Sequence, residues 1–340
     1  MPQPFRFGVM YDCRFRPGKG LDQTGVYAAV VEQAALADRL GLDLVWFTEH
    51  HFVDDGYLPA FQPVAGAVAA RTSRIRISND VLLLPFYHPL RLAEELAVLD
   101  HLSQGRMEVG IGMGYVPEEF QAFGHNVAHR VSLTEEAIQI MRQAWSDEPV
   151  RFSGRRYCID GIDVYPKPVQ PGGPPMWIAA MKAPGARRAA RFDTHLLPQG
   201  TPAEVLDPWR EELRSSGRDP ADYRVGVTRS VLVTDDAERD WPIIRDAERY
   251  KMKVYERFFA ATPDTYTFGR KDAQPIPQTW IVGDAGHCAA EIGRFITDYG
   301  ITDMTTAGLP PGVDPEFMGR NLERIATEVL PRVRAVLGEA

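Results

Sequence analysis

The chain has 340 residues, of which 44% are hydrophobic and 25% are charged, and its formal net charge at pH 7 is −8. This composition is typical of a globular protein with a large core, and the length allows one large domain or two ordinary ones. Because Lys and Arg are interleaved with Asp and Glu, a nucleic-acid partner is not expected, since binding to phosphates needs clustered basic residues.

The cysteines are few and far apart, at Cys13, Cys158 and Cys288, and no C-x-x-C pair occurs. Neither a disulfide framework nor a cysteine zinc site is therefore predicted. The N-terminus shows no apolar run behind a basic segment, and no stretch of 18 apolar residues occurs. We expect a cytoplasmic protein that neither inserts into nor binds a membrane.

Short apolar runs alternate with segments of helical periodicity along most of the chain. The runs predict buried strands at Phe5–Met10, Leu44–Phe47, Ile75–Leu84, Met107–Ile111, Met176–Ala180, Thr194–Leu197, Arg224–Val233 and Asp303–Thr306. The periodic segments predict helices at Val26–Leu40, Phe61–Ala70, Leu90–Leu102, Leu133–Trp145, Ala183–Arg191, Ala203–Ser215, Ala285–Tyr299 and approximately Glu316–Leu337. This alternation predicts an α/β fold, a closed (β/α)8 TIM barrel that occupies residues 1–340 as a single domain.

Two segments interrupt the alternation. Residues 151–166 contain aromatic and glycine turn signals that predict a hairpin, and residues 235–277 are long, charged and rich in aromatic side chains. We expect them to be insertions after strands 4 and 7, where loops of a barrel often cover the substrate. A contact between subunits is the alternative.

Titratable residues follow the second predicted strand directly, in the order Thr48-Glu49-His50-His51-Phe52. The catalytic groups of a barrel lie on the loops that follow its strands. An imidazole exchanges protons near neutral pH, and a neighbouring carboxylate can fix its tautomer. We therefore expect Glu49, His50 and His51 to be catalytic, with a structural role for the histidines as the alternative.

A metal site is not expected at this position. A zinc site needs three or four protein ligands, and consecutive side chains on a strand point in different directions. His125 and His129 have the spacing of one helical face, but no carboxylate pattern accompanies them.

The segment Trp46–Phe52 resembles the E-H-H-F segment of the bacterial luciferase-like flavin monooxygenases. Further blocks follow in the order of that family: His88-Pro89-Leu90-Arg91-Leu92-Ala93-Glu94-Glu95, Leu99-Asp100, Ser103-Gln104-Gly105-Arg106, Gly110-Ile111-Gly112-Met113-Gly114, Glu118-Glu119-Phe120-Gln121-Ala122-Phe123-Gly124 and Gly173-Pro174-Pro175-Met176-Trp177-Ile178-Ala179-Ala180. The match is dense from about residue 5 to residue 200 and diffuse afterwards. Several blocks in order are specific, although each alone would be weak.

This resemblance implies a cofactor at the barrel mouth, either reduced FMN or the deazaflavin coenzyme F420. It also implies that the flavin ring rests against a bulged third strand with a cis peptide between non-proline residues, which falls at Asp80-Val81 in this chain. The polar pair Asn79-Asp80 is itself unusual inside an apolar strand. A buried carboxylate paired with an arginine is the alternative for Asp80.

The phosphate of the cofactor is implied to lie near the loops after strands 4 and 5. The glycines after strand 4 allow close approach of the backbone, and exposed amides can bind phosphate. Many FMN-binding relatives carry Arg between the last two glycines, where this chain has Met113. The resemblance implies these further cofactor contacts: Gly112, Gly114, Arg130, Ala180, Met181 and Lys182. A solvated helix start for Arg130 and a surface loop for Lys182 are the alternatives.

The implied reaction is a monooxygenation in which reduced FMN, supplied by a separate flavin reductase, reacts with O2 and a small organic substrate. His50 would be the acid or base, oriented by His51 or Glu49, and Tyr115 would line the substrate pocket. An F420-dependent hydride-transfer dehydrogenase or reductase is the first alternative, which Met113 keeps open. A non-catalytic flavin-binding protein is the second, although the intact histidine pair argues against it. The family also implies a homodimer.

Overall fold

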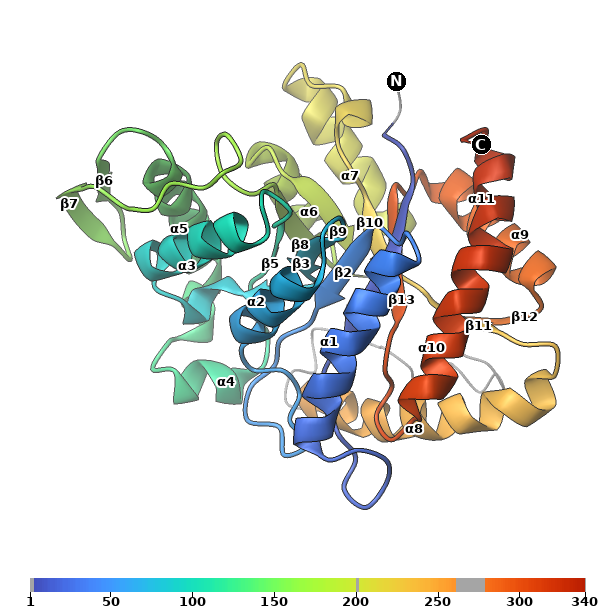
Figure 1. Cartoon of the computed structure of the whole chain (residues 1–340). Coiled ribbons are helices and arrows are strands. Elements are labelled where there is room, and N and C mark those ends of the chain that lie inside the picture. Colours follow the sequence, from blue (N-terminus) through green and yellow to red (C-terminus); the bar gives the residue numbers. More distant parts are fainter. Residues whose placement is uncertain (1–2, 200–201, 261–278, 340) are drawn as a thin grey trace.

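Strands and helices alternate along the chain in the computed structural model, which describes residues 3–199, 202–260 and 279–339 (Figure 1). The strands are β1 (Arg6–Tyr11), β2 (Leu44–Phe47), β3 (Arg76–Asn79), β4 (Leu82–Leu83), β5 (Val109–Gly112), β6 (Val150–Ser153), β7 (Cys158–Ile162), β8 (Met176–Ala180), β9 (His195–Pro198), β10 (Gly226–Thr228), β11 (Ser230–Val233), β12 (Trp280–Gly283) and β13 (Asp303–Ala307). The helices are α1 (Gln23–Arg39), α2 (Phe61–Arg71), α3 (Pro89–Leu102), α4 (Pro117–Ala122), α5 (Arg130–Trp145), α6 (Ala183–Arg191), α7 (Pro202–Ser215), α8 (Ala237–Ala260), α9 (Ala285–Tyr299), α10 (Pro315–Arg324) and α11 (Leu330–Leu337).

Parallel pairing joins most strands into two sheets, in the orders β10-β13-β1-β2-β3 and β4-β5-β8-β9. Two isolated parallel bridges, from Ile77 to Met107 and from Leu196 to Val225, connect the edges of these sheets. The strands of the two sheets therefore follow one another around a ring. Strands β11 and β12 pair with each other beside this ring. The predicted α/β fold with a parallel sheet is confirmed.

The third predicted strand is divided into β3 and β4, and the peptide between Asp80 and Val81 is cis, at the expected position. Two glycines of β5 allow close packing against this division. A Cβ atom on Gly110 would lie 1.8 Å from the carbonyl oxygen of Asn79, and one on Gly112 would lie 2.3 Å from Val81 Cγ2. Packing against the third strand is therefore sufficient to explain both glycines.

A network of buried charges closes the end of the barrel at which the strands begin. Glu108 accepts hydrogen bonds from Arg6 at 2.8 Å and from Trp177 Nε1 at 2.9 Å, and it also pairs with Arg76. Burial alone would raise the pKa of Glu108, but the two arginines hold it at about 2. Because this end is filled by paired side chains, ligands are expected at the opposite end of the barrel.

The predicted hairpin exists as β6 and β7, which pair antiparallel, but its expected position was wrong. It follows α5 rather than the fourth barrel strand, so it connects a helix to the next strand. In Figure 1 the hairpin lies at the upper left, whereas α4 and α8 lie at the lower end of the molecule. The hairpin therefore does not cover the loops that follow the strands.

The second predicted insertion does follow the seventh strand position, and its described part forms α8. Ion pairs attach α8 to the loop after β1: Arg16 contacts Asp246 at 2.7 Å, and Lys19 contacts the same carboxylate at 2.5 Å. Arg14 also donates to the carbonyl oxygen of Lys251 at 3.3 Å. These contacts hold α8 across the end of the barrel where β1 ends. Residues 261–277 of the predicted insertion lie outside the described residues.

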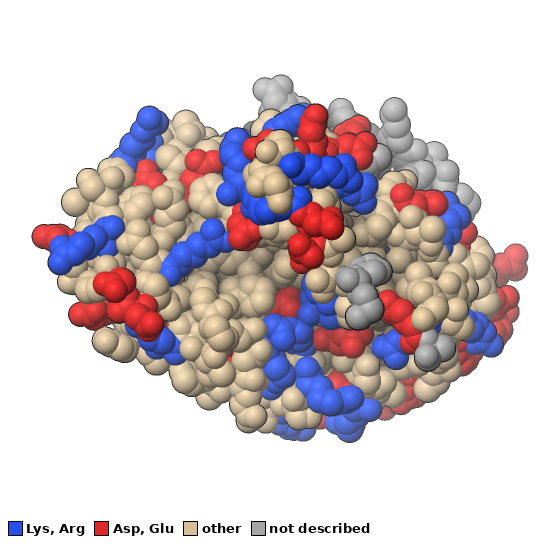
Figure 2. Space-filling view, turned by 90° about the horizontal axis from the view of Figure 1, so that it is seen from above, with Lys and Arg blue, Asp and Glu red and all other residues tan. Residues whose placement is uncertain are grey.

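The surface seen from above carries basic and acidic side chains close together (Figure 2). No helix in the described part of the chain combines the length and apolar character needed to cross a membrane.

Candidate active site

The histidine pair lies where β2 ends, and the two imidazoles have different partners. Nδ1 of His50 lies 2.9 Å from Oε1 of Glu119, and Nε2 of His51 lies 3.0 Å from Oε1 of Glu49. The backbone reverses direction here, because the next residue, Phe52, has a φ of 58°. The expectation that Glu49 or His51 orients His50 is therefore wrong, since Glu49 is paired with His51.

Glu119 is the carboxylate that orients His50, and the sequence analysis gave it no role. It comes from the short helix α4, and 1% of its surface is exposed. Its Oε1 accepts from Nδ1 of His50 and from the backbone N–H of His51 at 2.8 Å, while Oε2 has no hydrogen-bond partner among the described residues. Because a carboxylate accepts, Nδ1 of His50 carries a proton and Nε2 is the nitrogen left for a ligand.

Glu49 is buried like Glu119, but its carboxylate contacts a different set of groups. It accepts from Tyr87 Oη at 2.8 Å and from the backbone N–H of Leu83 at 3.4 Å, in addition to His51. Burial, followed by the negative charge of Glu49, raises the pKa of Tyr87. Glu49 thus connects the end of β2 to β4 and to the turn before α3.

Aromatic rings surround His50. The imidazole lies 4.9 Å from the ring of Tyr57, 5.7 Å from Tyr115 and 4.8 Å from Phe258. Tyr57 and Tyr255 share a hydrogen bond of 2.8 Å between their hydroxyls. Tyr255 and Phe258 belong to α8, so this helix forms one wall beside His50. Tyr115 packs beside His50, and burial raises its pKa; its role in lining a substrate pocket stays a prediction.

Asp80 lies inside the barrel near the C-terminal ends of the strands. Its carboxylate accepts from Gln199 Nε2 at 2.5 Å and from Thr228 Oγ1 at 3.2 Å. Burial raises the pKa of Asp80 to about 6, and the two hydrogen bonds lower it by less. The alternative of an arginine partner is not observed for Asp80 among the described residues.

The other expected cofactor residues lie on consecutive elements at the same end of the barrel. Val81, Met113, Gly114 and Met181 are partly exposed, whereas Gly112 and Ala180 are buried. Gly114 has a φ of 69° and turns the chain next to the ring of Phe120. These positions were predicted from the family match alone, because the residue types do not reveal the backbone geometry at these positions.

The two expected phosphate ligands begin neighbouring helices. Arg130 is the first residue of α5 and is partly exposed, and Lys182 is the N-cap of α6 and is exposed. An ion pair of 2.8 Å between Glu135 and Arg188 joins the two helices just beyond these starts. Neither Arg130 nor Lys182 forms an ion pair or side-chain hydrogen bond with another described residue. Their positive charges are available at helix N-termini, where anions are favoured.

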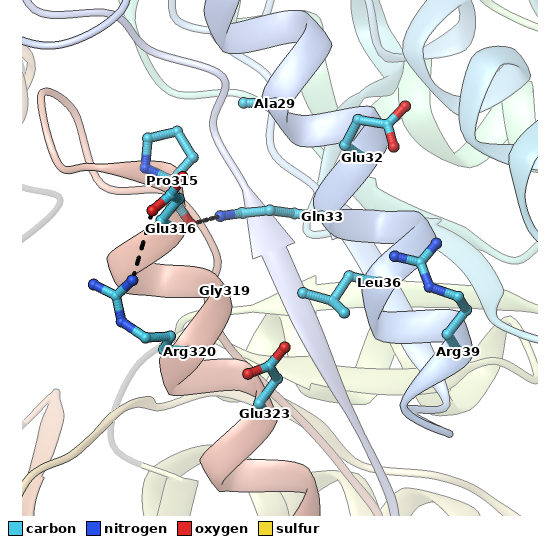
Figure 3. A pocket seen from close by; sticks show the side chains of 10 residues that line it. All are labelled: Ala29, Glu32, Gln33, Leu36, Arg39, Pro315, Glu316, Gly319, Arg320 and Glu323. Carbon is cyan, nitrogen blue, oxygen red and sulfur yellow. Dashed lines mark hydrogen bonds and ion pairs between the residues drawn. The ribbon is translucent and has the colours of Figure 1, made fainter.

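No group of three or more potential metal ligands occurs in the described ranges. A groove between α1 and α10 is lined by Ala29, Glu32, Gln33, Leu36, Arg39, Pro315, Glu316, Gly319, Arg320 and Glu323 (Figure 3). Its charges are mixed, and Gln33 crosses it to donate to the carbonyl oxygen of Pro315 at 3.0 Å. The groove lies on the outer helices and contains none of the candidate residues.

The model of the luciferase-like monooxygenase family matches residues 5–302. The chain belongs to this family. Among named relatives, an F420-dependent glucose-6-phosphate dehydrogenase of Amycolatopsis mediterranei is 28% identical over 90% of this chain and 95% of its own length. The 4-hydroxyprotoasukamycin monooxygenase of Streptomyces nodosus subsp. asukaensis is 26% identical over 90% and 87%.

A solved structure of a luciferase-like enzyme has the same fold. The oxygenating constituent of 3,6-diketocamphane monooxygenase from Pseudomonas putida, in complex with FMN, superposes with a TM-score of 0.81. It is 20% identical and covers 98% of this chain and 99% of its own. Luciferase-like relatives of this chain thus include both a monooxygenase and an F420-dependent dehydrogenase.

Proposed function

We propose that the protein is a flavin-dependent monooxygenase that uses reduced FMN and O2 to oxygenate a small organic substrate. The observation that carries this proposal is the His50–Glu119 pair at the C-terminal end of the barrel strands. Its imidazole has a described hydrogen-bond partner only at Nδ1, which is held by a buried carboxylate, and aromatic rings surround it. We also propose that a separate reductase supplies the reduced FMN and that the protein acts as a cytoplasmic homodimer.

The residues present fit a phosphorylated flavin. Arg130 and Lys182 offer two cations without described partners at the starts of α5 and α6, which suits a phosphate. Asp80 and Val81 would contact the flavin ring, with Gly112, Met113, Gly114, Ala180 and Met181 along the same side of the mouth. Bound FMN would supply the two-electron chemistry with O2.

The protein's own groups would position the reactants and move protons. Nε2 of His50 would donate or accept a proton at the substrate, while Glu119 stabilises the charged imidazolium. Tyr57, Tyr115 and Phe258 would exclude water from this nitrogen, which strengthens its interactions with a bound substrate. The pair Glu49–His51 would hold the loop rather than react.

An F420-dependent hydride-transfer dehydrogenase is the second candidate. It is favoured by Met113, at the position where many FMN-binding relatives have an arginine, and by the likeness to an F420-dependent dehydrogenase over most of both chains. In such an enzyme His50 would exchange a proton with the hydroxyl or carbonyl group of the substrate.

Equilibrium binding of the two cofactors distinguishes these candidates. Purified protein is titrated anaerobically with reduced FMN and, in parallel, with reduced F420. Tighter binding of reduced FMN, together with substrate-dependent O2 consumption, is the expected result. Tighter binding of F420 without O2 consumption would replace the monooxygenase by the dehydrogenase, and binding of neither would reject both.

The phosphate ligands are tested by a cofactor that lacks the phosphate. Arg130→Ala and Lys182→Ala should each weaken FMN binding about 10- to 100-fold, because each removes a charged hydrogen bond to phosphate. Riboflavin affinity should stay within about twofold. Arg191→Ala, at the exposed far end of α6, is the matched control. Equal losses for FMN and riboflavin would remove these residues from the phosphate site.

A further inference from the structure

Among the described residues, the carboxyl group of Asp80 has only neutral hydrogen-bond partners. Gln199 follows β9, and Thr228 ends β10; both donate to Asp80. Thr305 of β13 lies 2.9 Å from the hydroxyl of Thr228 and extends the chain of hydroxyls. The backbone N–H of Asp80 donates to the carbonyl oxygen of Phe47 at 2.7 Å. Asp80 is thus held by groups from β2, β10 and the end of β9, without a balancing positive charge among the described residues.

The charged groups on the surrounding elements are engaged elsewhere. Glu49, after β2, is paired with His51, and Arg229, next to Thr228, lies over the ring of Phe295 at 4.8 Å. On β13, Asp303 pairs with arginines at the opposite end of the barrel. Strand β5 has no titratable side chain. None of these groups is close enough to form an ion pair with Asp80.

Asp80 is nevertheless open to the mouth of the barrel. Asp80 is partly exposed as a residue, as are Met10, Val81 and Ala179, which pack on the inner cluster of Trp46 and Trp177. A ligand that enters the mouth therefore reaches this carboxyl group. Burial raises the pKa of this carboxyl group to about 6, which makes protonation near neutral pH less costly than for an ordinary aspartate.

We propose that Asp80 takes up one proton from solvent when the reduced cofactor binds, so that the anionic reduced ring is received by a neutral carboxylic acid. This inference rests on the proposed function. The reduced ring of FMN carries a negative charge near neutral pH, and a carboxylate beside it in a poorly solvated site would repel it. A protonated Asp80 avoids this repulsion and can donate a hydrogen bond. The oxidised ring is neutral, so its binding does not require Asp80 to be protonated.

The consequence is a pH dependence that distinguishes the redox states of the cofactor. A group that titrates near pH 6 when free, and must be protonated in the complex, weakens binding about tenfold for each pH unit above that value. From pH 6.5 to pH 8.0, Asp80 should therefore account for about a 20-fold loss of affinity for the reduced form. Asp80 should contribute much less to the pH dependence of the affinity for oxidised FMN.

The experiment measures the dissociation constants of reduced and oxidised FMN anaerobically between pH 6.0 and 8.5. Wild type is compared with Asp80→Asn, whose amide can accept from Gln199 and donate to Thr228. Oxidised FMN carries the same phosphate and corrects for its titration. Asp54→Asn is the matched control, because Asp54 is an exposed carboxylate on the loop after β2. Calorimetry in two buffers of different ionisation enthalpy counts the protons taken up.

We expect the pH slope for reduced FMN to be shallower in Asp80→Asn, with about one proton fewer taken up near pH 7.5, and to be unchanged in Asp54→Asn. Equal slopes in wild type and Asp80→Asn would overturn the proposal while leaving the flavin function intact. Absence of binding to wild type would instead reject the proposed function and the inference together. If Asp80→Asn does not bind oxidised FMN, Asp80→Ser is measured in its place.

Discussion

Replacing His50 by alanine should abolish product formation while FMN binding stays within about twofold of wild type. The imidazole contacts Glu119 and a set of aromatic rings, but no residue of the expected phosphate site. Positioned acid–base groups contribute about 10²- to 10⁴-fold to a rate, so kcat should fall by that order. Steady-state kinetics and an anaerobic FMN titration on the same preparation measure both quantities.

Two further variants make the His50 result specific. His50→Gln retains a polar side chain of similar size, which separates the loss of the proton carrier from the cavity that alanine leaves. His88→Gln is the control, because His88 is exposed on the turn before α3 and contacts only the ring of Tyr157 in the aromatic network. Turnover of His50→Gln at the wild-type rate would exclude His50 as the acid or base.

The elements of the barrel could be predicted from local patterns because most strands are buried on both faces. β2 has four buried residues in succession, and the predicted bounds match the observed ones. The predicted helix at Ala183–Arg191 also has the observed bounds. β12 and α4 were missed, because each is short and neither shows a periodicity of its own. The position of the hairpin could have been predicted, because the predicted helix at Leu133–Trp145 already lies between the fourth predicted strand and residues 151–166.

The sequence predicted where the candidate active site lies, but it did not predict which side chains contact one another there. The residues after β2 could be assigned to the barrel mouth, and the family match located the cis peptide at Asp80-Val81. Which carboxylate orients which histidine depends on the fold bringing α4 to the end of β2, 69 residues apart in the chain. The sequence placed Glu119 in a family block, but its local pattern does not distinguish it from the neighbouring Glu118, because burial becomes visible only in the structure.

The glycines after strand 4 also show that the sequence predicts a position better than it predicts the contacts made there. Residue types suggested a backbone that approaches a phosphate, whereas the structure provides a packing reason for Gly110 and Gly112 against β3 and Val81. A glycine in the sequence indicates that a side chain at that position would collide with a neighbouring group. It does not indicate whether that group belongs to the protein or to a ligand. Phosphate binding at Gly112 and Gly114 therefore remains a prediction that depends on the cofactor experiments.

Glu119→Gln should lower kcat about 10- to 100-fold, because the carboxylate acts through His50. Glutamine retains an acceptor for Nδ1 of His50 and for the backbone N–H of His51, so the loop geometry should persist. It removes the negative charge that stabilises the imidazolium, and a neutral partner can also favour the wrong tautomer. The rate is measured at one pH with saturating FMN and saturating substrate.

The adjacent residue provides the control for this charge. Glu118→Gln removes a carboxylate from the same helix, but Glu118 is exposed and has no described hydrogen-bond partner, so kcat should not change. In the double variant His50→Ala, Glu119→Gln, the second change should cost little, because a group that acts through His50 loses its effect when His50 is absent. Additive losses would limit Glu119 to holding the backbone of His51.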